Sequence, residues 1–174
     1  MGTAVAIVVA VALAELLLSG IWAPFYFRAG IPVFSRTLPY RGGRNRAVDA
    51  DVLSKTFASS VVSSIVFRAI GPEEIAFRER LLQLTFIGYA PVMRGLIRFD
   101  EYSQQVTVRG HANACPLCFL ATAVGFCLRG PSGGGFEVFP LVPTVVLLFG
   151  VVYAFQAVRF NGVCKEVEKQ LRAR

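Results

Sequence analysis

The feature that most constrains this chain is a pair of apolar runs near its end, Ala112–Leu128 and Phe136–Phe160. Charged residues are almost absent from both runs. Residues 129–135 join them with Arg, Gly, Pro and Ser, a composition typical of a turn. A surface helix of a soluble domain carries a polar face, which neither run provides. We therefore interpret the pair as a helical hairpin in a membrane.

The composition of the 174-residue chain agrees with this interpretation. Hydrophobic residues make up 55% of it, whereas soluble domains average about 45–50%. Charged residues make up only 17%, against an average of about 25%. A soluble protein of this composition has little polar surface with which to cover itself. Lipid as the solvent of the long apolar runs removes that difficulty.

An earlier apolar run, Thr3–Phe27, is interrupted only by Glu15. No basic segment precedes it, and it exceeds the about 7–15 apolar residues of a signal peptide, so it predicts a retained transmembrane helix. Arginines follow this run and none precedes it, which places the N-terminus outside and the chain from Arg28 onward in the cytoplasm. The excess of arginine over lysine is typical of a GC-rich bacterial genome, so the expected location is a bacterial inner membrane.

The middle of the chain, residues 28–110, is polar enough to fold outside the lipid. Its first part is rich in Pro and Gly and predicts a linker, and Asp49 is placed to cap a short helix through Phe57. A helix over Glu73–Leu84 is an alternative to a strand there, because Glu-Glu after Gly-Pro also begins helices well. Four antiparallel strands are predicted, over Val61–Ile70, Ile75–Leu84, Gly95–Phe99 and Gln105–Arg109.

The predicted fold is a membrane α-helical protein with a small α+β antiparallel-sheet domain on the cytoplasmic side. In the last residues, Val163, Val167 and Leu171 recur every four positions among charged side chains, which is the pattern of an amphipathic helix. The predicted parts are transmembrane helix 1 at 3–27, the α+β domain at 28–110, the hairpin of transmembrane helices 2 and 3 at 111–160, and a cytoplasmic amphipathic tail at 161–174.

Glu15 is the unusual residue of the first predicted span, since a carboxylate in mid-bilayer costs about 2.5–3.5 kcal/mol or more. We interpret it as a helix-packing or assembly residue, with a role in proton-coupled transport as the alternative. Small residues at four-residue spacing also predict close packing against another helix or another copy of the chain. They are Ala6, Ala10, Ala14, Ala121, Gly125, Gly150 and Ala154.

The remaining candidate for chemistry is the pair Cys115 and Cys118, with His111 four residues before the first thiol. A Cys-x-x-Cys at the start of a helix suits a membrane thiol oxidoreductase or part of a metal site. The next ligand would have to be Cys164, which would lie roughly 20 Å further along the helix axis at ~1.5 Å per residue. We therefore interpret these cysteines as small apolar residues and expect no catalytic residue, metal or cofactor.

Arg41, Arg44 and Arg46 form a basic loop without the glycine spacing of a phosphate-binding loop, and lipid headgroups are their expected partners. The net charge of +7 is concentrated beside the apolar runs, so nucleic acid is not expected as a partner. The sequence thus predicts an integral inner-membrane protein without enzymatic activity. Its expected role is assembly, anchoring or accessory binding of membrane lipid, a protein partner or further copies of itself.

Overall fold

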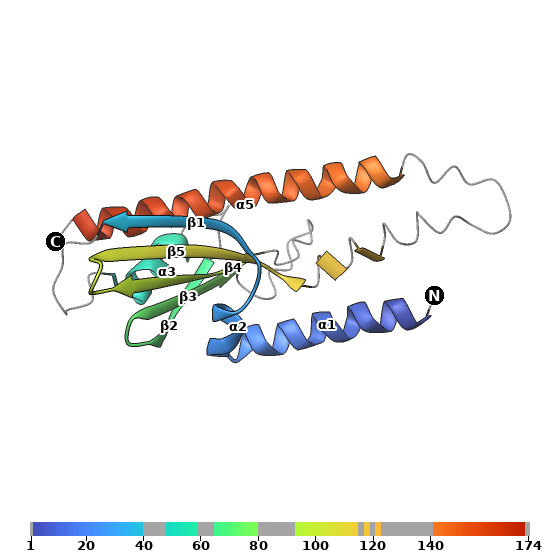
Figure 1. The fold of residues 1–174 in the computed structure, drawn as a ribbon, viewed down its shortest axis with the longest axis horizontal. Helices are drawn as coiled ribbons and strands as arrows, with labels where there is room; N and C mark the ends of the chain where they lie inside the picture. Colours follow the sequence, from blue (N-terminus) through green and yellow to red (C-terminus); the bar gives the residue numbers. More distant parts are fainter. Residues whose placement is uncertain are drawn as a thin grey trace, which may run out of the picture.

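The computed structural model describes residues 2–39, 48–58, 65–79, 93–114, 117–118, 121–122 and 141–172. A five-stranded antiparallel sheet lies at its centre, with helices on both faces (Figure 1). The spatial order of the strands is β1-β5-β4-β3-β2. Their bounds are Pro32–Pro39 (β1), Ile65–Gly71 (β2), Glu74–Glu79 (β3), Met93–Asp100 (β4) and Gln105–Ala112 (β5).

Strands β2 to β5 follow one another as a meander, and β1 joins the free edge of β5. A tight turn at Pro72 and Glu73 reverses the chain between β2 and β3. The turn after β4 is held by Asp100, whose carboxylate accepts hydrogen bonds from the backbone N–H groups of Tyr102 and Ser103 at 3.0 and 3.3 Å. Both turns use residue types that favour chain reversal.

One face of the sheet, here called the inner face, packs against two helices, α3 (Ala50–Ala58) and α5 (Leu141–Arg172). Alternate strand residues point into this core, because successive side chains leave a strand on opposite sides. The second half of α5 closes the core with its apolar stripe. The buried members of the core are Leu38, Val48, Leu53, Phe57, Ile65, Phe67, Ile75, Phe77, Ile97, Val106, Val108, Phe160, Val163, Cys164 and Val167.

The opposite face, here called the outer face, is covered at one end by α2 (Pro24–Arg28) and the end of α1 (Gly2–Gly20). Trp22 joins the two helices in the left-handed backbone region, with φ of 58°, a conformation that costs about 1–3 kcal/mol. Its ring stacks on Phe27 with 5.4 Å between centroids, and the guanidinium of Arg78 lies 4.6 Å from its centre. These contacts offset the strain and fix the direction in which α1 leaves the sheet.

Several local predictions are confirmed. Helix α3 lies where the sequence places a helix, and the Asp49 carboxylate caps it by accepting a hydrogen bond from the N–H of Asp51 at 2.8 Å. The β4–β5 hairpin is confirmed, and Glu74–Glu79 is a strand rather than the alternative helix. The predicted linker is partly wrong, because Pro32–Pro39 is an edge strand. Proline is tolerated at such a position, where its missing N–H need not remove a ladder hydrogen bond.

The predicted membrane helices are contradicted. Among the residues that the structure describes, no helix is long and apolar enough to cross a membrane. The run Thr3–Phe27 divides at a turn after Gly20 into α1 and α2, and Ala112 of the second run belongs to β5. The third run does not end at Phe160, because α5 continues to Arg172 as an amphipathic helix on the sheet. The predictions of three transmembrane helices and of an integral, multi-pass inner-membrane protein are therefore wrong.

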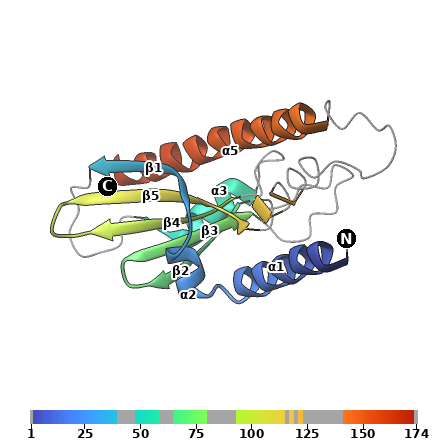
Figure 2. The same cartoon turned by 45° about the vertical axis from the view of Figure 1, so that its right-hand side comes forward.

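Two helical segments extend beyond the same end of the sheet (Figures 1 and 2). We call them the α1 arm, Gly2–Gly20, and the α5 arm, residues 141–155. The α1 arm leaves from the outer face and the α5 arm from the inner face, so the sheet lies between their bases. The end from which they extend is called the arm end below, and the β4–β5 turn marks the far end.

Candidate functional site

A first polar junction ties the α1 arm to the outer face. The Arg94 side chain of β4 is only 8% exposed, and its Nη1 forms an ion pair with Glu15 Oε1 at 3.3 Å. The same nitrogen donates to Asn113 Oδ1 at 3.4 Å, while Nη2 donates to the carbonyl of Ala29 at 2.8 Å. The guanidinium carbon also lies 3.7 Å from the centre of the Tyr26 ring, a cation–π contact. Arg94 is therefore held from three sides.

Glu15 is the shared acceptor of this junction. Besides Arg94, its Oε1 accepts hydrogen bonds from the Tyr26 hydroxyl at 3.1 Å and from the backbone N–H of Ala114 at 2.6 Å. Burial raises the pKa of Tyr26 to about 12, with Arg94 opposing the shift and Glu15 adding to it, so this hydroxyl stays a proton donor at neutral pH. One carboxylate thus connects α1, α2 and the segment after β5.

His111 of β5 is the cross-strand partner of Arg94 and is buried. Its pKa is lowered from 6.5, first because burial disfavours the charged imidazolium and then because Arg94 and Arg109 are positive. Gly30 passes against this pair with φ of 141°, and a Cβ there would lie 2.8 Å from Arg94 Nη2. Glycine is required by both the backbone conformation and the space.

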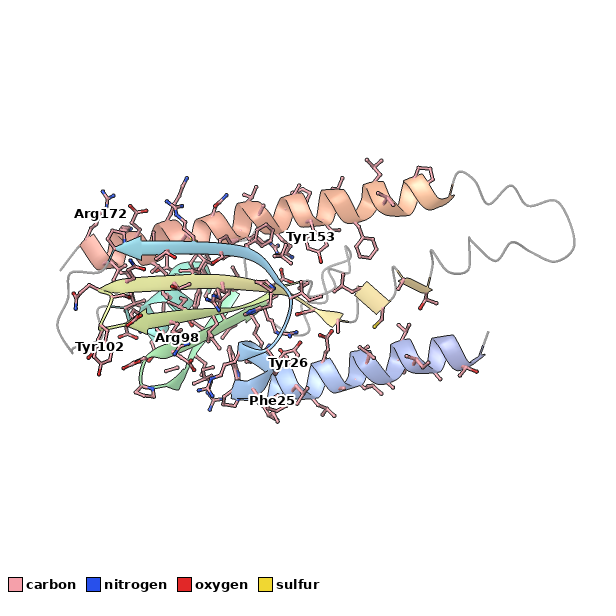
Figure 3. All side chains as sticks on the ribbon, viewed as in Figure 1. Phe25, Tyr26, Arg98, Tyr102, Tyr153 and Arg172 are labelled. Carbon is pink, nitrogen blue, oxygen red and sulfur yellow. The ribbon has the colours of Figure 1, made fainter. Side chains whose placement is uncertain are left out.

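A second polar junction ties the α5 arm to the inner face. Glu79, at the end of β3, is buried, and its Oε1 accepts hydrogen bonds from Gln156 Nε2 and Arg159 Nη1, each at 2.7 Å. Gln156 is completely buried, although it lies in an otherwise apolar stretch of α5. Tyr153 and Tyr26 mark the bases of the two arms in Figure 3. A charge-assisted hydrogen bond to a buried carboxylate is stronger than a neutral one, so this contact fixes where α5 meets the sheet.

The two junctions lie on opposite faces of the sheet and contain the same kinds of groups. Each combines a buried carboxylate, an arginine and an uncharged hydrogen-bond donor. Beyond each junction the large exposed side chains of the arm are all apolar, and they are between 47 and 69% exposed. On the α1 arm they are Ile7, Val9, Leu13, Leu16 and Leu17, and on the α5 arm Val146, Leu147, Val151 and Phe155.

Two of the site residues predicted from the sequence, Glu15 and His111, lie at the first junction. Glu15 does so through Arg94 of the sheet rather than through another apolar helix. The small residues that the structure describes are exposed, so their packing against a further helix stays a prediction; they are Ala6, Ala10, Ala14, Ala121, Gly150 and Ala154. The predicted residues outside the described ranges are Gly125, Arg41, Arg44, Arg46 and Cys115.

The cysteine and histidine candidates are dispersed. Cys118 is a free, half-buried thiol, and its predicted partner Cys115 lies outside the described residues. Cys164 is a free thiol in the inner core, where burial raises its pKa to about 11. Within the described part of the chain, no three His, Cys, Asp or Glu side chains are grouped so as to hold a metal ion. His111 belongs instead to the first junction, beside Arg94.

Sequence reasoning missed most of the junction residues. Arg94 and Glu79 lie at the ends of strands and Arg159 lies within α5, and for a charged residue a solvated side chain is the usual expectation. Gln156 gave the one available signal, since an amide in an apolar run needs a hydrogen-bond partner. Its partner could not be identified, because Glu79 is 77 residues away along the chain.

Protein-family models, curated proteins and solved structures provide no match to this chain. A proposal for the function therefore has to be argued from the two arms and the two junctions.

Proposed function

We propose that this protein is a lipid-binding α+β module. Its two arms contact acyl chains, and its sheet domain lies in the water at the lipid surface. The observation that carries this proposal is the exposed apolar surface of both arms, which extend from the same end of the sheet (Figure 1). Single exposed apolar residues are normal on a protein surface, but a continuous surface of many such residues marks an interaction site.

The width of the apolar surface favours lipid over a single protein neighbour. With 3.6 residues per turn, the exposed positions of each arm spread over about half of the helix circumference. A helix that packs on one protein surface shows an apolar stripe of roughly 100°. A fluid apolar phase can cover a wider arc, because its molecules approach the helix from several directions.

The border of the apolar surface has the residues expected where lipid meets water. Between the α1 arm and β1, three further apolar side chains are exposed, those of Ile21, Phe25 and Ile31. Arg28 follows on the same helix as Phe25, and it is held by an ion pair with Glu74 at 2.8 Å. Aromatic and arginine side chains commonly occupy such a border, since each has an apolar part and a polar end.

Vesicle flotation with the full-length protein and neutral phosphatidylcholine vesicles tests the proposal. The wild-type protein is expected to float with the vesicles. The variant Leu13→Asp/Leu147→Asp places one charge on each arm and should bind the vesicles at least about a hundredfold more weakly, since each substitution removes about 1.5–3 kcal/mol of apolar burial. Tyr102→Asp is the matched control, because Tyr102 is fully exposed in the turn at the far end (Figure 3).

A second copy of the chain is the other candidate occupant of the arms. The exposed stripe of Ala6, Ala10 and Ala14 on α1 would allow close approach of another helix. Three results together would establish a second copy as the occupant and refute the lipid proposal. The wild-type protein would form a discrete dimer in size-exclusion chromatography, the variant Leu13→Asp/Leu147→Asp would be monomeric, and the wild-type protein would not float with vesicles. Equal flotation of the wild type and this variant would refute the lipid proposal as well.

A further inference from the structure

We propose that the uncovered part of the outer sheet face binds an acidic segment of a partner protein through Arg98 and Arg109. This inference is independent of the lipid proposal. Helix α2 and the end of α1 cover the outer face over Ala76 and Leu96, with Val66 and Ile70 of β2 packed against the same cluster. The rest is a polar surface on strands β1, β5 and β4. Its residues, placed by the strand register, are Ser35, Thr37, Pro39, Arg98, Asp100, Gln105, Thr107 and Arg109.

The two arginines lack the ion pairs that other arginines of this chain have. In the described part of the chain, Arg68, Arg98 and Arg109 have no carboxylate within ion-pair distance, and all three are exposed. The guanidinium of Arg78 is placed against Trp22. The arginines that do pair with carboxylates are Arg28, Arg36, Arg94, Arg159 and Arg172.

The acids nearest to Arg98 are already engaged. Glu74 is its cross-strand partner on β3, yet the Glu74 carboxylate pairs with Arg28 at 2.8 Å. Asp100, two residues on, accepts the backbone hydrogen bonds of the β4–β5 turn. Hydrogen bonding to Ser103 is the main reason why the pKa of Asp100 is lowered, so this carboxylate stays ionised in the turn. The charge of Arg98 also contributes to the lowered pKa of Asp100, but neither acid forms an ion pair with Arg98, so its guanidinium can pair with a carboxylate from another molecule.

The spacing of the two arginines fits an extended acidic segment. Arg98 lies opposite Thr107, so Arg109 is its diagonal neighbour on β5. Diagonal positions on neighbouring antiparallel strands are about 7–8 Å apart. Alternate residues of an extended peptide point the same way and repeat about every 7 Å. A Glu-x-Glu pattern can therefore place one carboxylate on each guanidinium, whose fork accepts both carboxylate oxygens.

Two other anionic partners fit this surface less well. None of its residues is aromatic, so it offers no platform on which nucleic acid bases could stack. Lipid headgroups are disfavoured by position. Arg98 lies four residues beyond Arg94 along β4, which is about 13 Å further from the arms at ~3.3 Å per residue.

Fluorescence anisotropy with labelled poly-L-glutamate and the full-length protein tests the inference. Arg98→Ala/Arg109→Ala is expected to weaken binding roughly tenfold or more, because both charge-assisted pairs with the peptide carboxylates are lost. Arg68→Ala is the matched control, since Arg68 is an equally exposed arginine of the outer face on β2, beyond the strands that carry the proposed surface. It should change binding less than about twofold.

Any of three results would overturn the inference. They are unchanged poly-L-glutamate binding in the double variant, an equal loss of that binding in Arg68→Ala, and tighter binding of polyuridylate than of poly-L-glutamate. A loss of preference for phosphatidylserine over phosphatidylcholine vesicles, without any loss of poly-L-glutamate binding, would assign the two arginines to headgroups instead. Flotation with phosphatidylcholine vesicles should not change in the double variant, which separates failure here from failure of the lipid proposal.

Discussion

Arg94 of β4 and Glu15 of α1 are 79 residues apart in the chain and form an ion pair at 3.3 Å, with side chains only 8 and 12% exposed. Because the pair is nearly dry, each charge depends on the other for stabilisation. The pair, rather than apolar contact alone, therefore determines where the α1 arm meets the sheet.

Arg94→Ala should lower the free energy of unfolding by about 3–5 kcal/mol, because it leaves the Glu15 carboxylate in a low-dielectric site without its cation. Glu15→Ala/Arg94→Ala should recover part of that loss, since no single buried charge remains. Urea denaturation monitored by circular dichroism measures both values. A double variant that loses the full sum of the two single losses would show that the ion pair contributes nothing to the junction.

Gly95→Ala should also destabilise the protein, by about 1–3 kcal/mol. The Phe77 ring lies directly across Gly95 on the neighbouring strand, and a Cβ at this position would overlap the ring. Gly150→Ala is the control, because nothing lies within 4 Å of its would-be Cβ and alanine favours a helix by roughly 0.5–1 kcal/mol. Thermal denaturation should therefore move in opposite directions for the two variants.

Ser54 protects the edge of the sheet at β2. Its hydroxyl accepts a hydrogen bond from the N–H of Phe67 at 3.0 Å and donates one to the Phe67 carbonyl at 3.2 Å. Ser54→Ala should cost about 1–2 kcal/mol and expose backbone groups that can pair with another strand. Light scattering during mild heating should rise earlier in this variant than in Lys55→Ala, an exposed neighbour on α3. Identical scattering curves would contradict the protective role.

The stability of the protein should depend on pH on both sides of neutrality. The pKa of His111 is lowered by burial, so its stabilising contribution is present above about pH 6.5 and is lost as pH falls through the lower folded value. The pKa of Cys164 is raised from 9.0 to about 11, so its contribution is present below pH 9 and is lost as pH rises through about 11. Urea midpoints measured across this range should be highest between these limits.

Two substitutions identify the residues whose titration lowers the stability on each side of neutral pH. His111→Gln should remove much of the decrease below pH 6.5, and Cys164→Ala should remove part of the decrease above pH 9. Tyr26 adds a further decrease toward pH 12, where its raised pKa is reached. If His111→Gln retains the wild-type slope below pH 6.5, another group titrates there.

Local periodicity was sufficient to predict part of the fold. The alternation around Val106 and Val108 predicts a strand, and Asp49 before an apolar stripe predicts a helix, because both signals lie within a few residues. Strand β1 was missed, since Pro32 and Pro39 at its ends are typical of a loop. Only its place at the edge of the sheet, beside β5, makes those prolines acceptable.

The apolar runs were correctly located, but their structural role was not. Mean hydropathy shows that a segment avoids water, and it contains no information on where the helix ends or turns. The turn at Trp22 depends on contacts with Phe27 and Arg78, and Arg78 lies far away in the sequence. The junctions were missed for the same reason, because Arg94 and Glu79 acquire their partners only when distant segments meet.

The position of β1 beside β5 has a consequence for biosynthesis. A ribosome releases β1 long before its partner, so this strand stays unpaired while β2, β3 and β4 are made. The inner face then stays open until Val163 and Val167 emerge. The nascent chain therefore carries an apolar helix and an open sheet together, which is the kind of intermediate that chaperones bind. Contacts this distant in sequence also make refolding of the isolated protein slow.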